Sequence, residues 1–207
     1  MYRLIYKIIN KLNSLFYFLF VFPKYKLLFK NISTGGCIKK PLLMTYNCIN
    51  IGKNVFIQKG ARVEGVTKYL KNNFTPLIII NDSVSIEQNL HLTCANKIEI
   101  GSNTAIASNV TITDINHPYI DINVAPEKQA IETSFVKIGE DCKIYNNVVI
   151  LPSTELGKHT VVGANSVVIG KKYPDYCILV GAPAKIVKRY NFEKKEWQKT
   201  NDIGDFI

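Results

Sequence analysis

Residues 136–168 read VKIGEDCKIYNNVVILPSTELGKHTVVGANSVV, and an aliphatic residue returns in this stretch at every sixth position. The series is Ile138, Ile144, Ile150, Leu156, Val162 and Val168. A period of six excludes an amphipathic helix, whose apolar positions return every three to four residues, and it exceeds the alternation of an ordinary strand. Two inward side chains per six residues, followed by a turn, predict a short strand and a corner. Three such units close one triangular coil of a parallel β-solenoid.

The same period extends toward both ends of the chain. Further members are Ile51, Ile57, Ile80, Ile86, Leu92, Ile100, Ile106, Ile112, Val180 and Ile186. Residues 51–188 are therefore predicted to form about five to six stacked coils. Residues 64–79 and 118–135 break the period, and we expect the first to be a loop or irregular turn and the second an excursion from the solenoid. Long loops in compact domains are usually functional, and this excursion begins directly after His117.

The composition fits one folded domain. The chain has 207 residues, of which 47% are hydrophobic and 20% charged, which excludes a disordered or fibrous protein. The five cysteines are an odd number without a CxxC pair, so neither a disulfide framework nor a cysteine-based zinc site is predicted. A reducing, cytoplasmic location is the simplest interpretation.

The positive charge is concentrated at the amino terminus. Residues 1–63 hold 11 basic and no acidic side chains, whereas the rest of the chain is nearly neutral. Nucleic-acid binding is not supported, because the basic excess coincides with an apolar segment and no nucleic-acid motif is present. The apolar run at residues 15–22 is too short to cross a bilayer, and no small-residue cleavage site of a signal peptide follows it.

This amino-terminal segment has the spacing of an amphipathic helix. The apolar positions are Leu4, Ile5, Ile8, Ile9, Leu12, Leu15 and Phe16, with Arg3, Lys7 and Lys11 on the other side. Residues 1–30 would then either contact an anionic membrane peripherally or pack on the protein's own body or another subunit. The predicted division of the chain is an amino-terminal segment (1–40), the solenoid (41–190) and a short carboxy-terminal helix and tail (191–207).

The hexads, together with TITDINHP (111–118) and ILVGAPAKIVKRYN (178–191), resemble the hexapeptide-repeat acyltransferases. Within them the chain looks most like the bacterial O-acetyltransferases of surface polysaccharide synthesis, which are related to maltose and galactoside acetyltransferases. The resemblance implies an all-β, left-handed parallel β-helix with a short helix from about residue 192. It also implies a homotrimer with sites between subunits and acetyl-CoA as co-substrate, with no metal. The implied acceptor is a sugar hydroxyl of O-antigen or capsule or of its precursor, and the sequence leaves open whether that sugar is free, nucleotide-linked or lipid-linked.

On this resemblance His117 matches the catalytic histidine. An imidazole suits removal of a proton from a sugar hydroxyl as its oxygen attacks a thioester. Asp114 and Asn116 could orient that ring or contact the acceptor, and either could instead cap the corner through the backbone. Asn89 matches an acceptor-binding asparagine of the galactoside and maltose enzymes.

For acetyl-CoA, the acetyl donor, the resemblance points to backbone N–H groups at Asn146 and Ala164 that would contact the thioester. It also points to Lys185 and Lys188 as cations that would bind the phosphates. The alternative for the two lysines is a solvated tail. Lys143 and Tyr145 replace a tryptophan and a glycine that are usual in the family. The tryptophan often borders the acceptor or the pantetheine arm of acetyl-CoA, so the shape of the substrate site can differ here.

Three other functions are compatible with a solenoid. An N-acetyltransferase acting on an amino-sugar nucleotide would use the same base and donor. A trimeric zinc carbonic anhydrase would need three ligands from His91, His117 and His159, which lack the expected close pair. A non-catalytic binding protein would show regular threonine ladders on one face, and none are evident.

Overall fold

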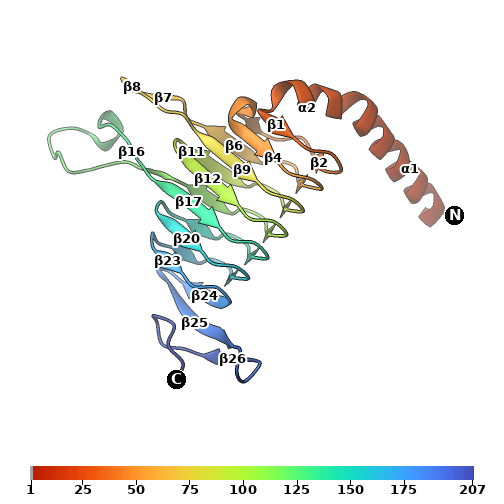
Figure 1. Ribbon diagram of the computed structural model, residues 1–207. Helices are drawn as coiled ribbons and strands as arrows, with labels where there is room; N and C mark the ends of the chain where they lie inside the picture. Colours follow the sequence, from red (N-terminus) through yellow and green to blue (C-terminus); the bar gives the residue numbers. More distant parts are fainter. Residues whose placement is uncertain (1) are drawn as a thin grey trace.

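The chain forms a parallel β-helix with three faces, as seen in the computed structural model, which describes residues 2–207 (Figure 1). Each coil runs through one strand of face A, one of face B and one of face C, and the corners are named A–B, B–C and C–A in chain order. The predicted parallel β-helix is therefore confirmed.

Face A is built from β1 (Asn31–Ile32), β4 (Ile49–Ile51), β9 (Leu77–Ile80), β12 (Lys97–Ile100), β17 (Phe135–Ile138), β20 (Thr154–Leu156) and β23 (Lys172–Tyr173). Face B is built from β2 (Cys37–Ile38), β5 (Phe56–Ile57), β10 (Ser85–Ile86), β13 (Ala105–Ile106), β18 (Lys143–Ile144), β21 (Val161–Val162) and β24 (Cys177–Gly181). Face C is built from β3 (Leu43–Met44), β6 (Arg62–Gly65), β11 (His91–Cys94), β14 (Thr111–Thr113), β19 (Val149–Ile150) and β22 (Val167–Val168).

The hexad residues line the inside of the coils, except Val180, which is 41% exposed while its neighbour Leu179 takes the inward position. Parallel pairing sets Ile100 beside Ile138 and Ile106 beside Ile144, so identical side chains stack from coil to coil. These four side chains are at most 1% exposed. Full burial of one such side chain contributes about 1.5–3 kcal/mol, and the stack therefore supplies most of the stabilisation of the fold.

Asparagines form a ladder along the B–C corner. Asn89 donates to Asn109 (Nδ2 to Oδ1, 3.1 Å), Asn109 to Asn147 (3.2 Å), and Asn147 to Asn165 (2.9 Å). All four have φ near +60°, in the left-handed region that asparagine tolerates better than most residues. The ladder satisfies exposed amides and fixes the spacing of the coils at this corner.

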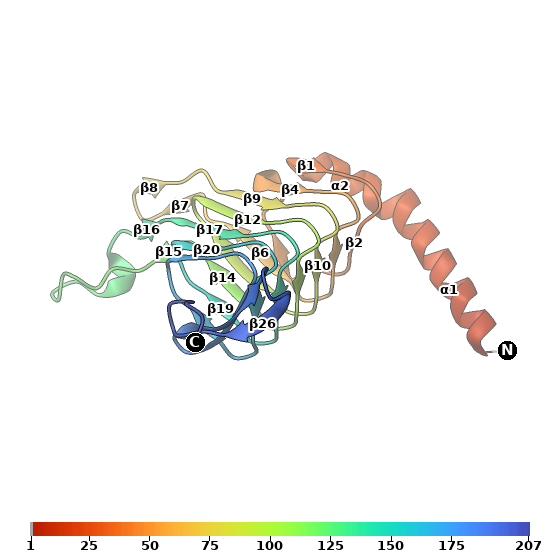
Figure 2. The ribbon, with the colours of Figure 1, turned by 60° about the horizontal axis from the view of Figure 1, so that its bottom comes forward.

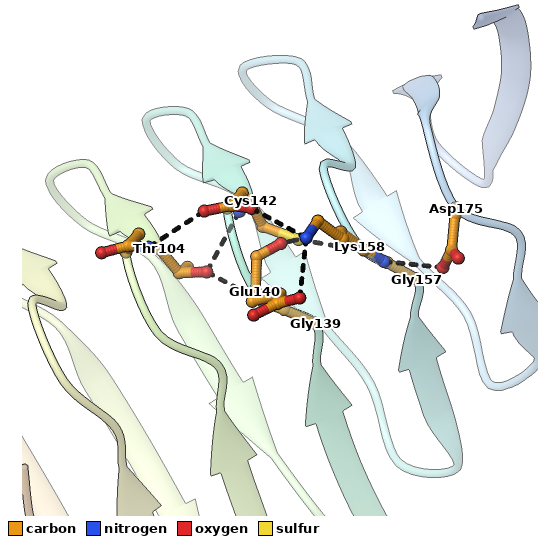
Figure 3. A network of polar contacts seen from close by, with 9 residues as sticks. Thr104, Gly139, Glu140, Cys142, Gly157, Lys158 and Asp175 are labelled. Atoms are coloured by element: carbon orange, nitrogen blue, oxygen red, sulfur yellow. Dashed lines mark hydrogen bonds and ion pairs between the residues drawn. The ribbon is translucent and has the colours of Figure 1, made fainter. Parts of the chain in front are cut away.

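The A–B corner is held by a different network, shown in Figure 3. The buried Thr104 hydroxyl donates to the Gly139 carbonyl (2.9 Å) and accepts from the Cys142 N–H (3.1 Å). One coil further on, the Lys158 N–H donates to Asp175 (2.8 Å), and the Lys158 ammonium lies 2.8 Å from Glu140. Burial raises the pKa of the Cys142 thiol to about 11, in agreement with a core side chain.

Replacement of Thr104 by valine is expected to lower the free energy of unfolding by about 1–3 kcal/mol, because the buried Cys142 N–H loses its acceptor. Urea unfolding followed by circular dichroism measures the change. Thr75→Val, at an exposed position, is the matched control. Equal midpoints for the two variants would show that the Thr104 hydroxyl does not hold the corner.

The β-helix begins at Asn31, ahead of the predicted boundary at residue 41, because β1 and β2 pair with β4 and β5. Before it lie α1 (Tyr2–Phe16), the π-helical turn η1 (Tyr17–Val21) and α2 (Phe22–Leu28), and the 3-10 turn η2 (Tyr46–Cys48) precedes β4. Tyr25 and Phe29 pack against Tyr46 and close the first coil, whereas α1 projects away from the body (Figures 1 and 2).

Met1 and the side chains of Leu4, Lys7 and Ile8 lie outside the described residues. Within residues 2–207, no helix combines the length and apolarity needed to span a membrane.

The prediction of a carboxy-terminal helix from about residue 192 is wrong. Residues 184–199 form the antiparallel strands β25 (Ala184–Asn191) and β26 (Glu196–Lys199), which extend face B beyond β24. The Asn191 side chain accepts from the N–H groups of Glu193 and Lys194 (3.0 Å each), and Lys195 has φ 55°. This side-chain-capped turn competes with a helix start and closes a hairpin instead.

Candidate active site

Two insertions leave the β-helix at the C–A corner. The first follows β6 and contains the hairpin of β7 (Lys68–Tyr69) and β8 (Asn72–Asn73), within the segment 64–79 that was expected to be irregular. The second is the predicted excursion, which follows β14. Its stem is the antiparallel pair β15 (Ile115–Asn116) and β16 (Glu132–Thr133), and a 3-10 turn, η3 (Pro126–Lys128), lies within it. The excursion thus starts slightly earlier than the predicted 118 and extends away from the coils (Figures 1 and 2).

The hairpin and the excursion meet around His117. The Tyr69 ring lies edge-on to the His117 ring, with centroids 5.4 Å apart. The Tyr69 hydroxyl donates to the Glu127 carbonyl oxygen (2.6 Å), and Glu127 Oε2 lies 2.9 Å away. Desolvation and the Glu127 carboxylate raise the pKa of Tyr69, which keeps its hydroxyl a donor. His117 itself is exposed, so its ring is both supported and accessible.

Tyr69 is not among the site residues that the sequence predicts. The contact between Tyr69 and His117 joins two insertions that are distant in the sequence, and no local sequence pattern predicts it. Only the stacking of the coils brings both insertions to the same corner.

Asp114 lies at the base of the excursion and is fully buried. Its carboxylate accepts from the N–H groups of Ala95 and Asn96 (2.8 Å each) and from the Cys94 thiol (3.3 Å). The structure therefore places this carboxylate in the corner of the preceding coil. Of the roles considered for Asp114, the geometry favours capping of a corner over contact with the acceptor.

Asn116 borders a pocket of about 510 Å³ between the stem and the next coils. Its side chain donates to Glu132 Oε2 (3.3 Å) across the stem. The lining also includes Ser134 and Ser153, whose hydroxyls lie 2.6 Å apart. The pocket is polar, and one of its lining residues, Asn116, directly precedes His117 in the sequence. Its hydroxyl and amide groups suit hydrogen bonds to a polar acceptor.

The donor candidates Asn146 and Ala164 lie at the B–C corner, on adjacent coils. The Asn165 N–H donates to the Asn146 carbonyl (3.0 Å), which links the two corner turns. Within residues 2–207 the N–H groups of Asn146 and Ala164 themselves make no hydrogen bond, so both are available to a ligand. Beside them, the Lys143 ammonium lies 5.4 Å from the centre of the Tyr145 ring, and Tyr145 is 44% exposed. The residues that depart from the family pattern thus face this corner.

The remaining candidates lie apart from His117. Asn89 belongs to the B–C ladder described above. Lys185 and Lys188 lie on β25, where the Lys185 ammonium contacts Asp202 of the tail (2.6 Å) and Lys188 is exposed.

The candidate residues therefore divide between the two edges of face C. His117 and Asn116 lie at the C–A corner, and Asn89, Asn146 and Ala164 lie at the B–C corner. A single chain does not bring the predicted base and the predicted acetyl-CoA positions together.

The histidines show no arrangement for a metal. His91 Nε2 lies 2.9 Å from Arg62, His117 packs on Tyr69, and His159 stacks on Tyr176 at the A–B corner. Among the described residues, no group of three or more His, Cys, Asp or Glu side chains could hold a metal ion. The carbonic anhydrase interpretation is not supported by these positions.

Comparison with known proteins agrees with the fold and the motifs. The bacterial transferase hexapeptide (six repeats) family model matches residues 135–170. A lipopolysaccharide biosynthesis O-acetyl transferase of Escherichia coli, WbbJ, is 37% identical over 158 residues, which cover 73% of this chain and 76% of that protein. A galactoside O-acetyltransferase of Escherichia coli is 26% identical over 83% of this chain and 70% of its own length. Among solved structures, the AntD N-acyltransferase of Bacillus cereus, in complex with dTDP-4-amino-4,6-dideoxyglucose and coenzyme A, superposes with a TM-score of 0.65. It shares 18% identity, over 82% of this chain and 88% of that one.

These similarities define a class: the chain is an acyltransferase of the hexapeptide-repeat type, with the left-handed parallel β-helix of that class. More particularly, it belongs to the hexapeptide-repeat acetyltransferases that include WbbJ and the galactoside O-acetyltransferases. The predicted acetyl-CoA-dependent acetyltransferase is confirmed at the level of the family.

Replacement of Tyr69 by leucine is expected to lower kcat about tenfold and to leave KM for acetyl-CoA unchanged, because the ring contact and the link to Glu127 are both lost. Tyr69→Phe keeps the ring and should fall in between. Steady-state release of coenzyme A measures both constants, and Leu70→Ala, at the exposed hairpin tip, is the control. A rise in KM for acetyl-CoA without a change in kcat would refute a positioning role.

Proposed function

We propose that the chain transfers an acetyl group from acetyl-CoA to a sugar hydroxyl of a surface polysaccharide or its precursor, with His117 as general base. The observation that carries this proposal is the exposed His117 at the base of the excursion. Tyr69 contacts its ring, and the preceding residue, Asn116, lines a polar pocket. The similarity to a lipopolysaccharide biosynthesis O-acetyl transferase supports the acceptor class.

The reaction is direct transfer. An imidazole nitrogen of His117 takes the proton of the acceptor hydroxyl as its oxygen attacks the thioester carbonyl. Negative charge develops on the carbonyl oxygen, and an unpaired N–H group at the B–C corner, that of Asn146 or Ala164, stabilises it. The carbon–sulfur bond then breaks, and the thiolate of coenzyme A leaves with the proton from His117. Lys185 and Lys188 are proposed to contact the phosphates of the donor.

We infer that the site is completed by a second copy of the chain in a cyclic trimer. Face C lies between the two corners that carry the candidate residues, so packing around face C sets the B–C corner of one subunit against the C–A corner of the next. From β14 onward the outward side chains of face C are uncharged, for example Thr111, Val149 and Val167. Face A instead carries ion pairs such as Lys97–Glu99 and Lys137–Glu155. The excursion also exposes Tyr119, Ile120 and Ile122, apolar residues that suit contact with a neighbour.

Complementation tests the shared site. His117→Ala and Ala164→Trp chains are each expected to be inactive alone, because each lacks one half of every site. Mixed trimers of the two should recover activity, since some interfaces then pair an intact base with an intact donor corner. Recovery is measured after co-refolding, against separately refolded chains combined afterwards. Mixed trimers without activity would place both halves of the site in one chain.

The amino-terminal helix supports peripheral contact with an anionic membrane surface. Ile5, Ile9, Leu12, Phe16 and Leu19 are 48–60% exposed and follow helical spacing along α1 and η1. The segment carries basic residues and no acid. Such a helix lies in the headgroup region of a bilayer, where a lipid-linked acceptor would be presented.

The proposed function is tested by release of coenzyme A from acetyl-CoA with and without extracted cell-surface glycolipid. Stimulation by glycolipid, with incorporation of acetyl that mild alkali removes, is the expected result, because esters are hydrolysed where amides are not. Acetyl resistant to alkali would indicate an amino-sugar acceptor instead. Absence of stimulation by any glycolipid would overturn the assignment.

A further inference from the structure

A groove of about 580 Å³ opens between the amino-terminal helices and the first two coils, at the B–C corner. Its floor is apolar and comes from both parts of the chain. The apolar lining residues are Phe16, Val21, Tyr25, Cys37 and Ile38. None of the catalytic or donor candidates lines it.

The rim of this groove is basic. Lys39 and Lys40 follow β2, and Lys59 follows β5 one coil later, where the Gly60 N–H donates to the Lys40 carbonyl (3.1 Å). All three lysines are exposed, and within residues 2–207 none of them lies in an ion pair. The first acidic residue of the chain, Glu64, is already paired with Arg62. The groove thus combines an apolar floor with an uncompensated positive rim.

The groove also continues the exposed face of the amino-terminal helix. Phe16 belongs to both, since it lies on the exposed stripe of α1 and lines the groove. An apolar path therefore leads from the helix surface to the three lysines. An amphipathic surface helix alone would not require a cavity at its end.

We propose that this groove binds one molecule of an anionic membrane phospholipid, with an acyl chain on the apolar floor and the phosphate at Lys39, Lys40 and Lys59. The inference rests on the membrane contact in the proposed function and adds a single-lipid site to it. The charge complementarity selects a phosphate, and the apolar floor selects a lipid over a free phosphate. The groove lies on the first two coils, whereas His117 follows β14 and the acetyl-CoA candidates follow β18 and β21 on later coils, so the bound lipid is an anchor and not the acetylated acceptor.

The test uses the full chain and native mass spectrometry in detergent, with dioleoyl phosphatidic acid as the probe and dioleoylglycerol as its phosphate-free counterpart. One phosphatidic acid per chain is expected, and dioleoylglycerol should bind at least tenfold more weakly. A lysine near an anionic lipid surface contributes about fivefold in affinity. The triple variant Lys39→Gln/Lys40→Gln/Lys59→Gln should therefore bind phosphatidic acid about 100-fold more weakly.

The matched control is Lys194→Gln/Lys195→Gln/Lys199→Gln, which removes the same charge at the opposite end of the β-helix, beyond the reach of screened electrostatics (Figure 1). Equal losses in the two triple variants, or equal binding of the two lipids, would overturn the proposal. Phe16→Ser should also weaken phosphatidic acid binding. An unchanged affinity would show that the acyl chain does not lie on the apolar floor of the groove. The variant Lys39→Gln/Lys40→Gln/Lys59→Gln should release coenzyme A at the wild-type rate with a delipidated, water-soluble acceptor. If the wild-type protein itself released no coenzyme A with that acceptor, the proposed acetyl transfer would be refuted, and not the lipid site.

Discussion

Replacement of His117 by alanine is expected to lower kcat by about 10²–10⁴-fold, the usual contribution of a positioned general base. The histidine is exposed at the base of the excursion, and its ring contact is with Tyr69. Truncation should therefore leave folding unchanged and act on the chemical step alone. Binding of acetyl-CoA should persist, because the donor candidates lie at the other corner of face C. The measurement is glycolipid-dependent release of coenzyme A, together with the dissociation constant for acetyl-CoA.

The control for this variant is His159→Ala, which removes an imidazole stacked on Tyr176 at the A–B corner. Its kcat is expected to match that of the wild type. If His117→Ala kept more than a tenth of the wild-type kcat, another group would have to be the base. If it lost acetyl-CoA binding as well, His117 would belong to the donor groove.

Replacement of Asp114 by alanine is expected to lower the free energy of unfolding by about 3–5 kcal/mol. The buried carboxylate is the acceptor for two backbone N–H groups and one thiol, and all three donors would be left without it. Activity should fall together with stability, because the carboxylate holds the corner of the preceding coil against the base of the excursion that carries His117. Urea unfolding and glycolipid-dependent turnover measure the two effects.

Asp114→Asn keeps one oxygen acceptor and should lose less stability than Asp114→Ala. Asp121→Ala, at an exposed position in the excursion, is the matched control, with an expected change below about 0.5 kcal/mol. A stable Asp114→Ala protein without activity would contradict the corner role and point to contact with the acceptor.

The coils could be predicted from the sequence because their cause is local and repeated. Each hexad places one aliphatic residue inside, and the pairing of Ile106 with Ile144 or Ile112 with Ile150 follows from the period alone. The first coil was still missed. Ile32, Ile38 and Met44 keep the six-residue spacing, but the extra residue around η2 shifts the register to Ile51, and the basic, apolar surroundings favoured a separate segment.

The parts that could not be predicted depend on contacts between distant segments. Tyr69 and His117 come from insertions in different coils, and the burial of Asp114 depends on the corner at Ala95 and Asn96. The tail residues NFEKKEW have a helix-compatible composition, but pairing of Tyr190 with Trp197 selects the hairpin. In each case tertiary context decided between local alternatives of similar energy.

The hairpin of β25 and β26 has a consequence for the behaviour of the protein at high concentration. A parallel β-helix ends in open strand edges that could template the next molecule and polymerise into fibres. Antiparallel β25 occupies the edge of face B after β24, while α2 with Tyr25 and Phe29 covers the first coil. Face B thus ends in an antiparallel hairpin and the first coil lies under a helix, which disfavours end-to-end growth in the parallel register and favours assembly through the sides of the coils.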